Sequence, residues 1–229
     1  MAKPYELIVF DWDGTLMDSV AKIVASLRAA AVDVALPALS DKQLRDVIGL
    51  GLQEALEVLY PNAEEKQLLR FVECYRHHFL AACPTPETLF SGVRELLHDL
   101  NQQSLKLGVA TGKSRKGLDR VLKHTACGVY FHATRCADET RSKPHPQMLL
   151  EIIEVLGVEP DKTLMIGDSE YDMEMASRAG ADALAVTYGV HEPHRLDSHR
   201  PLALLDSVEA LGGWLDTNLL NSNKRMDVK

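Results

Sequence analysis

Residues 9–18 read VFDWDGTLMD, and this stretch decides how the rest of the sequence is interpreted. Residues 6–10 form a short apolar run, rich in β-branched and aromatic side chains, which predicts a buried strand. Asp11 and Asp13 then lie at the carboxyl end of that strand, where open α/β sheets bind their ligands. Gly14 allows a tight turn directly after them. Because two carboxylates this close repel each other, they favour either a bound cation or a retained proton; a solvated acidic turn is the alternative interpretation.

Composition excludes several classes of protein. The 229-residue chain is 46% hydrophobic, enough for a sizeable core, and its formal net charge of -8 argues against general binding to nucleic acid or to an anionic membrane. The four cysteines contain no C-x-x-C pair and predict reduced, mostly buried thiols. The sequence shows neither the apolar core of a signal peptide nor a stretch of membrane-spanning length. We therefore expect a cytoplasmic protein without a membrane partner.

Residues 19–83 are predicted to be helical. Four helices are predicted there from apolar spacing and breaks, at residues 20–36, 42–48, 52–60 and 63–82. The Gly49-Leu50-Gly51 break separates the second helix from the third, and Pro84-Thr85-Pro86 predicts a hinge after the fourth. These helices would form a bundle inserted directly after the acidic motif. The sequence thus divides into a catalytic core, residues 1–16 and 87–229, and a helical cap, residues 17–86.

From residue 87 onward helices and strands alternate, which is typical of a parallel sheet covered by helices. Helices are predicted at residues 92–102, 114–124, 145–156, 169–179 and 207–215. Strands are predicted at residues 105–110, 129–131, 163–166 and 183–186. Ser114 is the expected cap of one helix, and Gly157 and Gly180 are the expected ends of two others. The predicted fold class is α/β, a Rossmann-like doubly wound parallel sheet with an inserted α-helical cap, and the ending beyond Asn218 is predicted to fray.

Three further stretches place polar groups just past a predicted strand or in the loop that follows one. Thr111 and Gly112 follow one strand and precede a helix, an arrangement that suits an anion; a common turn is the alternative. Lys143 directly precedes Pro144 in a segment that two prolines stiffen, and it points either inward at a negative charge or into solvent. Asp168 follows another strand, and Asp172 lies four residues on, on the same helix face. The alternative for these two acids is a helix cap and an exposed carboxylate.

Taken together, these residues describe one reaction. Phosphoryl transfer needs charge compensation on the equatorial oxygens, a positioned nucleophile and control of the proton at the leaving oxygen. A metal ion, a lysine and backbone N–H groups supply the first requirement. Mg2+ suits such a site because it takes carboxylate, water and phosphate oxygens as ligands. The pattern therefore predicts a metal-assisted phosphate site.

In their order and separation these residues resemble the haloacid dehalogenase-like superfamily, specifically its phosphatases with a helical cap between the first two motifs. The resembling residues are Asp11-Trp12-Asp13-Gly14-Thr15 for the first motif, Thr111 for the second, Lys143 for the third, and Gly167-Asp168 with Asp172 for the fourth. The resemblance covers nearly the whole chain. The segment Ile48-Gly49-Leu50-Gly51 is similar to a cap loop of the phosphoglycolate-phosphatase-like branch.

The resemblance implies roles for the acids. Asp11 would attack phosphorus and form an aspartyl phosphate, and Asp13 would protonate the leaving alcohol and then take a proton from water. Mg2+ would be held by Asp11, by the backbone carbonyl of Asp13 and by Asp168, with Asp172 as an outer partner. The implied activity is Mg2+-dependent hydrolysis of a small phosphorylated metabolite.

The resemblance also implies which residues bind the substrate. Thr111, Gly112 and Lys143 would bind the transferring phosphoryl group. Gly49 and Gly51 would lie at the mouth of the site. The basic residues next to them form either a surface that attracts an anionic substrate or the exposed face of a helix; they are Lys113, Arg115 and Lys116.

Two other functions are considered. A sugar phosphomutase of the same superfamily would carry a cap histidine near the position held here by Ile23, which favours hydrolysis. A non-catalytic domain that binds phosphate or a protein partner would have no need of a general acid such as Asp13. The pairs His77-His78 and His191/His194 lack the spacing of a known metal site, so solvated surface is predicted for them.

Overall fold

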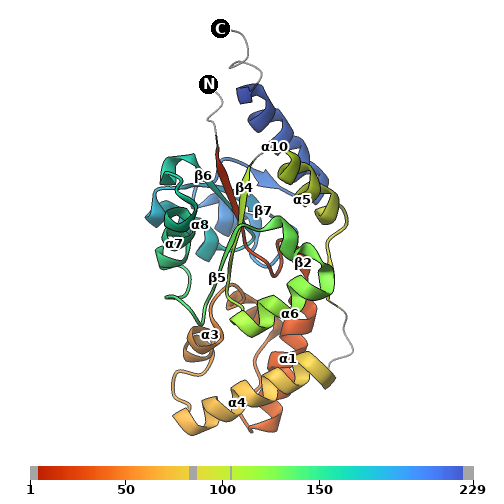
Figure 1. Ribbon diagram of the computed structural model, residues 1–229. Coiled ribbons are helices and arrows are strands. Elements are labelled where there is room, and N and C mark those ends of the chain that lie inside the picture. Colours follow the sequence, from red (N-terminus) through yellow and green to blue (C-terminus); the bar gives the residue numbers. More distant parts are fainter. Residues whose placement is uncertain (1–4, 83–86, 104, 224–229) are drawn as a thin grey trace.

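A six-stranded parallel sheet forms the centre of the upper part of the molecule (Figure 1). The computed structural model describes residues 5–82, 87–103 and 105–223. The strands of the sheet are β1 (Leu7–Phe10), β4 (Lys106–Thr111), β5 (Ala133–Cys136), β6 (Thr163–Gly167), β7 (Asp182–Val186) and β8 (Leu204–Leu205). Their order across the sheet is β5-β4-β1-β6-β7-β8. Phe10 pairs with Val109 of β4 and with Ile166 of β6. The residues that follow these three strands therefore meet at one edge of the sheet.

Helices cover both faces of the sheet, which confirms the predicted doubly wound α/β fold (Figure 1). One face is covered by α5 (Val93–Gln102), α6 (Arg115–Thr125) and α10 (Val208–Asn223), the other by α7 (Gln147–Leu156) and α8 (Glu170–Ala179). Side chains of β1 alternate between the two faces. Ile8 and Phe10 pack in the cluster that includes α5, α6 and α10, while Leu7 and Val9 pack with α7 and α8. The continuous apolar run of β1 is thus explained by burial on both faces.

A second group of helices lies below the sheet in Figure 1 and is called here the cap helices. Its members are α1 (Val20–Asp33), α2 (Asp41–Asp46), α3 (Leu52–Leu59), α4 (Glu65–His77) and the π-helical turn η1 (His78–Ala82). They bury their own apolar cluster, separate from the two clusters on the sheet. Ser40 starts α2 with a capping box, since its side chain accepts from the Gln43 N–H and the Gln43 side chain accepts from the Ser40 N–H. The domain boundaries predicted above remain a prediction.

A short antiparallel pair joins the two parts of the chain. It consists of β2 (Met17–Asp18) and β3 (Thr88–Leu89), with Met17 opposite Leu89. β2 leads into α1, and β3 precedes α5. The predicted hinge at Pro84-Thr85-Pro86 lies outside the residues that the structure describes.

Several local predictions are confirmed and others are wrong. Ser114 caps α6, and Gly157 and Gly180 end α7 and α8 in the left-handed conformation. The strand predicted at 129–131 is wrong: Cys127–Tyr130 is a 3-10 turn (η2), and the strand comes later as β5. The apolar run misled the prediction because Val129 is 82% exposed on a turn, whereas the polar β5 is an edge strand.

The end of the chain also differs from the prediction. The last helix continues to Asn223 rather than ending at residue 215, with Leu211, Leu215 and Leu219 buried against the sheet. The region predicted to fray beyond Asn218 therefore includes helical residues, and residues 224–229 lie outside the described part. The short elements η3 (Pro160–Lys162), α9 (Pro193–Asp197) and β8 were not predicted.

The predictions from composition are met in part. Cys74, Cys127 and Cys136 are free thiols, and two of the three are buried; Cys83 lies outside the described residues. No helix within the described ranges is both long and apolar enough to span a bilayer.

Candidate active site

The carboxyl edge of the sheet gathers the predicted site residues. Asp11 follows β1 and donates its backbone N–H to the Ile166 carbonyl at 2.9 Å, which aligns it with the end of β6. Thr111 is the last residue of β4, and Asp168 is the first residue after β6. All three side chains are buried, as is Lys143 from the loop before α7. Asp11, Thr111 and Asp168 therefore lie at the edge where their predicted strands end, and Lys143 reaches the same edge from a loop.

Three carboxylates form an acidic cluster at this edge. One carboxylate oxygen each from Asp11, Asp168 and Asp172 lie within 4.8 Å of one another. Lys143 bridges two of them, with Nζ 2.7 Å from Asp11 Oδ1 and 2.6 Å from Asp172 Oδ1. Lys143 thus points inward, and the solvated alternative is wrong.

Local contacts fix the orientation of the two later acids. Asp168 accepts hydrogen bonds from the Thr15 hydroxyl at 2.9 Å and from the Val190 N–H at 2.8 Å. The helix cap of α8 is Ser169 rather than Asp168, and its hydroxyl donates to Asp172 Oδ2 at 2.6 Å in a capping box. Asp172 is fully buried, so the alternative of an exposed acid is also wrong.

The electrostatics of the cluster follow from this burial. Burial raises the pKa of Asp11 to about 7; Lys143 acts in the opposite direction, and Asp172 adds repulsion. Burial, followed by repulsion from Asp11 and Asp172, also raises the pKa of Asp168 well above its usual range. Burial alone would lower the pKa of Lys143, but attraction to Asp11 and Asp172 raises it, so the ammonium stays charged. One cation among three carboxylates leaves negative charge uncompensated.

The cluster fits a hard divalent cation. Asp11 Oδ2 is buried and has no hydrogen-bond partner among the described residues, although a buried carboxylate oxygen normally has one. Carboxylate oxygens are the ligands that Mg2+ prefers. Gly14, with φ of +85°, brings the backbone against Asp168, where a Cβ atom would overlap the carboxylate. The glycine of the first motif is therefore needed for close approach to the cluster.

Asp13 makes its side-chain contacts with residues outside this cluster. Its Oδ1 accepts from the Ser19 hydroxyl at 2.5 Å and lies 2.9 Å from Lys113 Nζ. The carboxylate of Asp13 does not belong to the acidic cluster. Lys113 is largely buried at this contact rather than on an exposed helix face. Lys113 was predicted either to attract an anionic substrate or to lie on an exposed helix face. Ser19 was not predicted, because its contact with Asp13 depends on the turn after β1.

The loop of residues 48–51 in the cap helices packs over the same edge. A Cβ atom on Gly112 would overlap the carbonyl oxygens of Gly49 and Leu50. The Gly51 N–H donates to the Ser142 hydroxyl at 2.7 Å, one residue before Lys143. Gly49 and Gly51 thus lie beside Gly112 and the lysine loop, and their place at the mouth of the site stays a prediction. Ser142 was missed because nothing in its own segment distinguishes it from a loop serine.

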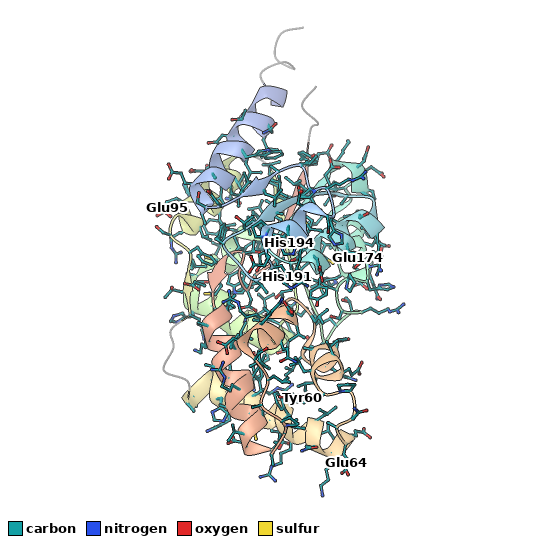
Figure 2. All side chains as sticks on the ribbon, turned by 180° about the vertical axis from the view of Figure 1, so that it is seen from behind. Tyr60, Glu64, Glu95, Glu174, His191 and His194 are labelled. Carbon is teal, nitrogen blue, oxygen red and sulfur yellow. The ribbon has the colours of Figure 1, made fainter. Side chains whose placement is uncertain are left out.

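His191 makes a further contact between the sheet part of the molecule and the cap helices. Figure 2 labels His191 near the middle of the molecule, above Tyr60 and Glu64, which lie at the ends of α3 and α4. The prediction of solvated surface is wrong for His191, which is 2% exposed. Its Nδ1 accepts from the Glu170 N–H at 3.1 Å and its Nε2 lies 3.2 Å from the Asp46 carbonyl, which also accepts from the Tyr171 hydroxyl. Burial lowers the pKa of His191 and favours the neutral ring that these contacts require. It is therefore a contact to α2 rather than a metal ligand.

Comparison with known proteins agrees with this geometry. The model of a family described as haloacid dehalogenase-like hydrolase matches residues 8–186. A probable phosphatase, IndB, of Dickeya dadantii is 32% identical over 90% of this chain and 92% of its own length. A phosphoglycolate phosphatase of Pseudomonas putida is 28% identical over 90% of this chain and 78% of its own. The crystal structure of a hydrolase from Pseudomonas syringae superposes with a TM-score of 0.85 at 26% identity, covering 93% of this chain and 99% of that one.

The family model matches most of the chain, and the chain has an acidic cluster at the strand ends of a doubly wound sheet. The protein therefore belongs to the haloacid dehalogenase-like hydrolases. Within that family it is a phosphoric monoester hydrolase of the phosphoglycolate-phosphatase-like branch.

Proposed function

We propose that the protein hydrolyses phosphomonoesters of small metabolites with Mg2+, through an aspartyl phosphate on Asp11. The observation that carries the proposal is the state of the Asp11 carboxylate. Lys143 holds Oδ1 at 2.7 Å, while Oδ2 is buried without a hydrogen-bond partner in the described part of the chain. An oxygen held in place but not hydrogen-bonded is suited to attack phosphorus or to bind a cation.

The first step would transfer the phosphoryl group to Asp11. A carboxylate oxygen of Asp11 attacks phosphorus, and the bond from phosphorus to the alcohol oxygen breaks. Protonated Asp13 gives its proton to that leaving oxygen. Because Ser19 and Lys113 both contact Oδ1 of Asp13, Oδ2 is the oxygen proposed to carry the proton.

The second step would restore the enzyme. The Asp13 carboxylate takes a proton from water, the water oxygen attacks phosphorus, and the bond to Asp11 breaks with release of phosphate. Lys143 would hold both Asp11 and an oxygen of the phosphoryl group, and the Thr111 hydroxyl with the backbone N–H of Gly112 would bind the other oxygens.

The acidic cluster would hold the metal ion. Asp11 and Asp168 would be ligands, together with the backbone carbonyl of Asp13, and Asp172 would be an outer partner through its contact with Lys143. When bound, Mg2+ would neutralise charge on the phosphoryl oxygens.

The test is phosphate release from an aryl phosphate, from acetyl phosphate and from alkyl phosphates, with Mg2+ and with EDTA. We expect turnover with Mg2+ only, and loss of turnover in Asp11→Asn with the circular dichroism spectrum retained. Wild-type activity in Asp11→Asn would show that the nucleophile is wrongly assigned.

Asp13→Asn should lose far more activity on the alkyl phosphate than on the aryl phosphate, because the aryl leaving group needs little protonation. Equal losses on both substrates would show that Asp13 is not the general acid. Absence of metal-dependent turnover on every ester would favour the non-catalytic binding domain.

The mutase alternative has no observation in its favour. Ile23, at the position where such enzymes would carry a cap histidine, is buried in the apolar cluster of the cap helices. Hydrolysis therefore remains the proposal.

A further inference from the structure

Asp46, the last residue of α2, is held by three side chains from the sheet part of the molecule. Its backbone carbonyl accepts from the Tyr171 hydroxyl at 2.8 Å and lies 3.2 Å from Nε2 of His191. Its carboxylate accepts from Nη1 of Arg195 at 2.7 Å. Tyr171 belongs to α8, Arg195 belongs to α9, and His191 lies in the loop between β7 and α9. We call Asp46, Tyr171, His191 and Arg195 the Asp46 clamp.

The three side chains that hold Asp46 are themselves linked. Arg195 forms a bidentate pair with Glu170, with Nη2 2.6 Å from Oε1 and Nε 3.2 Å from Oε2. The Glu170 N–H donates to Nδ1 of His191 at 3.1 Å, and the rings of His191 and Tyr171 meet edge to face with centroids 5.3 Å apart. A bidentate pair between a guanidinium group and a carboxylate fixes orientation as well as distance. The Asp46 clamp is therefore an ordered group rather than one isolated ion pair.

The loop that carries His191 also holds Asp168. The Val190 N–H donates to Asp168 Oδ2 at 2.8 Å, and the His191 N–H donates to the Asp168 carbonyl at 3.2 Å. A Cβ atom on Gly189 would lie 2.2 Å from the same Oδ2, so the loop backbone packs directly against the carboxylate. The Val190 side chain packs with the apolar cluster of the cap helices. Residues 189–191 thus contact both a proposed metal ligand and the cap helices.

A second connection runs through α8. Tyr171 is next in sequence to Asp172, the proposed outer partner of the metal ion. Gly49, three residues after Asp46, lies against the start of the same helix, since a Cβ atom on Gly49 would be 3.0 Å from Ser169 Oγ. The Ser169 hydroxyl in turn donates to Asp172. The end of α2 therefore contacts both segments that orient the acidic cluster from this side.

Resting on the proposed function, we propose that Asp46 is a positioning residue of the metal site, and that the docking of α2 through the Asp46 clamp and the binding of Mg2+ at Asp168 stabilise each other. A hydrogen-bond donor to a metal-binding carboxylate raises the affinity of the site because it fixes the orientation of that carboxylate. Here the donor is Val190, and the neighbouring His191 is held by Asp46. Because such coupling is reciprocal, each event strengthens the other by the same factor.

The alternative role of the Asp46 clamp is a surface contact that adds only to stability. The side chains of Arg195 and Asp46 are 24% and 40% exposed, and an exposed ion pair contributes little to stability on its own. In that case the loss of Asp46 would lower the melting temperature and leave the dissociation constant for Mg2+ unchanged. The metal affinity of the folded protein thus separates the two roles.

The first experiment is calorimetric titration of the full chain with Mg2+ at pH 8, with circular dichroism to verify folding. Asp46→Ala removes the carboxylate, and Tyr171→Phe removes one hydroxyl while it keeps the ring. Each should raise the dissociation constant for Mg2+ about fivefold or more. The matched control is Asp41→Ala, which removes an exposed ion pair with Arg28 at the other end of α2 and should keep the wild-type dissociation constant.

The second experiment measures the reverse effect by amide hydrogen exchange. In the wild type, Mg2+ should slow the exchange of α2 amides about fivefold or more, because metal binding strengthens the docking of this helix. In Asp46→Ala, the exchange of the same amides should respond little to Mg2+, since the connection to Asp168 is lost.

Each result decides the proposal. A dissociation constant unchanged in Asp46→Ala, or exchange of α2 that ignores Mg2+ in the wild type, overturns the coupling, while metal-dependent turnover by the wild type leaves the proposed function intact. A dissociation constant unchanged in Tyr171→Phe overturns the connection through α8. An equal loss of affinity in Asp41→Ala overturns the assignment to the Asp46 clamp. Absence of both Mg2+ binding and turnover in the wild type overturns the proposed function, and the coupling with it.

Discussion

Binding of Mg2+ should compete with protons at the acidic cluster. Burial raises the pKa of Asp11 to about 7, so below that pH the folded protein keeps a proton that a metal ion must displace. The apparent dissociation constant for Mg2+ should therefore rise about tenfold for each pH unit below 7, or about a hundredfold at pH 5, which equals about 3 kcal/mol. Asp168, whose pKa is also raised, should steepen the dependence.

The same pKa shift sets the sign of the stability change. Without a divalent cation, the folded state binds more protons than the unfolded chain between about pH 4 and pH 7, because an unperturbed Asp has a pKa near 3.9. This contribution is fully present at low pH and is lost as the pH rises through 7. Mg2+ should consequently raise the melting temperature more at pH 8 than at pH 5.

The assay is calorimetric titration with Mg2+ between pH 5 and pH 8, paired with melting curves in Mg2+ or EDTA. Circular dichroism at each pH verifies that the protein is folded. Asp11→Asn should bind Mg2+ more weakly at pH 8 and with a flatter pH dependence. Asp197→Asn, an exposed acid at the end of α9, should follow the wild type. An equal dissociation constant for the folded wild type at pH 5 and pH 8 would refute the reasoning.

Three further predictions concern the surroundings of the cluster. Lys143→Met leaves buried carboxylates without their cation, so it should reduce the free energy of unfolding measured in urea by about 3–5 kcal/mol. The control Lys162→Met removes an exposed ion pair and should reduce that free energy by less than about 1 kcal/mol. Equal losses in the two variants would contradict this prediction. Gly112→Ala should raise KM for an aryl phosphate about tenfold and lower the melting temperature, because the new methyl group overlaps the backbone carbonyl oxygens of Gly49 and Leu50; an unchanged KM would disprove the close packing. Ser142→Ala removes a buried hydrogen bond and should cost about 1–2 kcal/mol in urea, and a loss near zero would mean that water replaces the hydroxyl.

The arrangement of the core was predictable because local signals agreed with the global fold. The apolar run before Asp11 predicted a buried strand, and Gly157 and Gly180 marked helix ends through a conformation that favours glycine. Once the strands are parallel, their carboxyl ends meet at one edge, which places Asp11 beside Asp168 without any knowledge of side-chain packing.

Other features were hidden because they depend on tertiary contacts. Two-residue strands such as β2, β3 and β8 carry no measurable periodicity. The edge strand β5 is polar, while the apolar residues before it form a turn. Lys22 and Arg120 read as ordinary surface cations on their own helices, and only the approach of α6 to the cap helices brings both to Phe79. The spacing of residues likewise did not predict that Ser19 and Lys113 contact the Asp13 carboxylate.

The pairing of β2 with β3 has a consequence for the orientation of Asp13. Ser19, directly after β2, is the residue whose hydroxyl holds Asp13. The ribbon that connects the sheet to the cap helices therefore also sets the position of the Ser19 hydroxyl against Asp13.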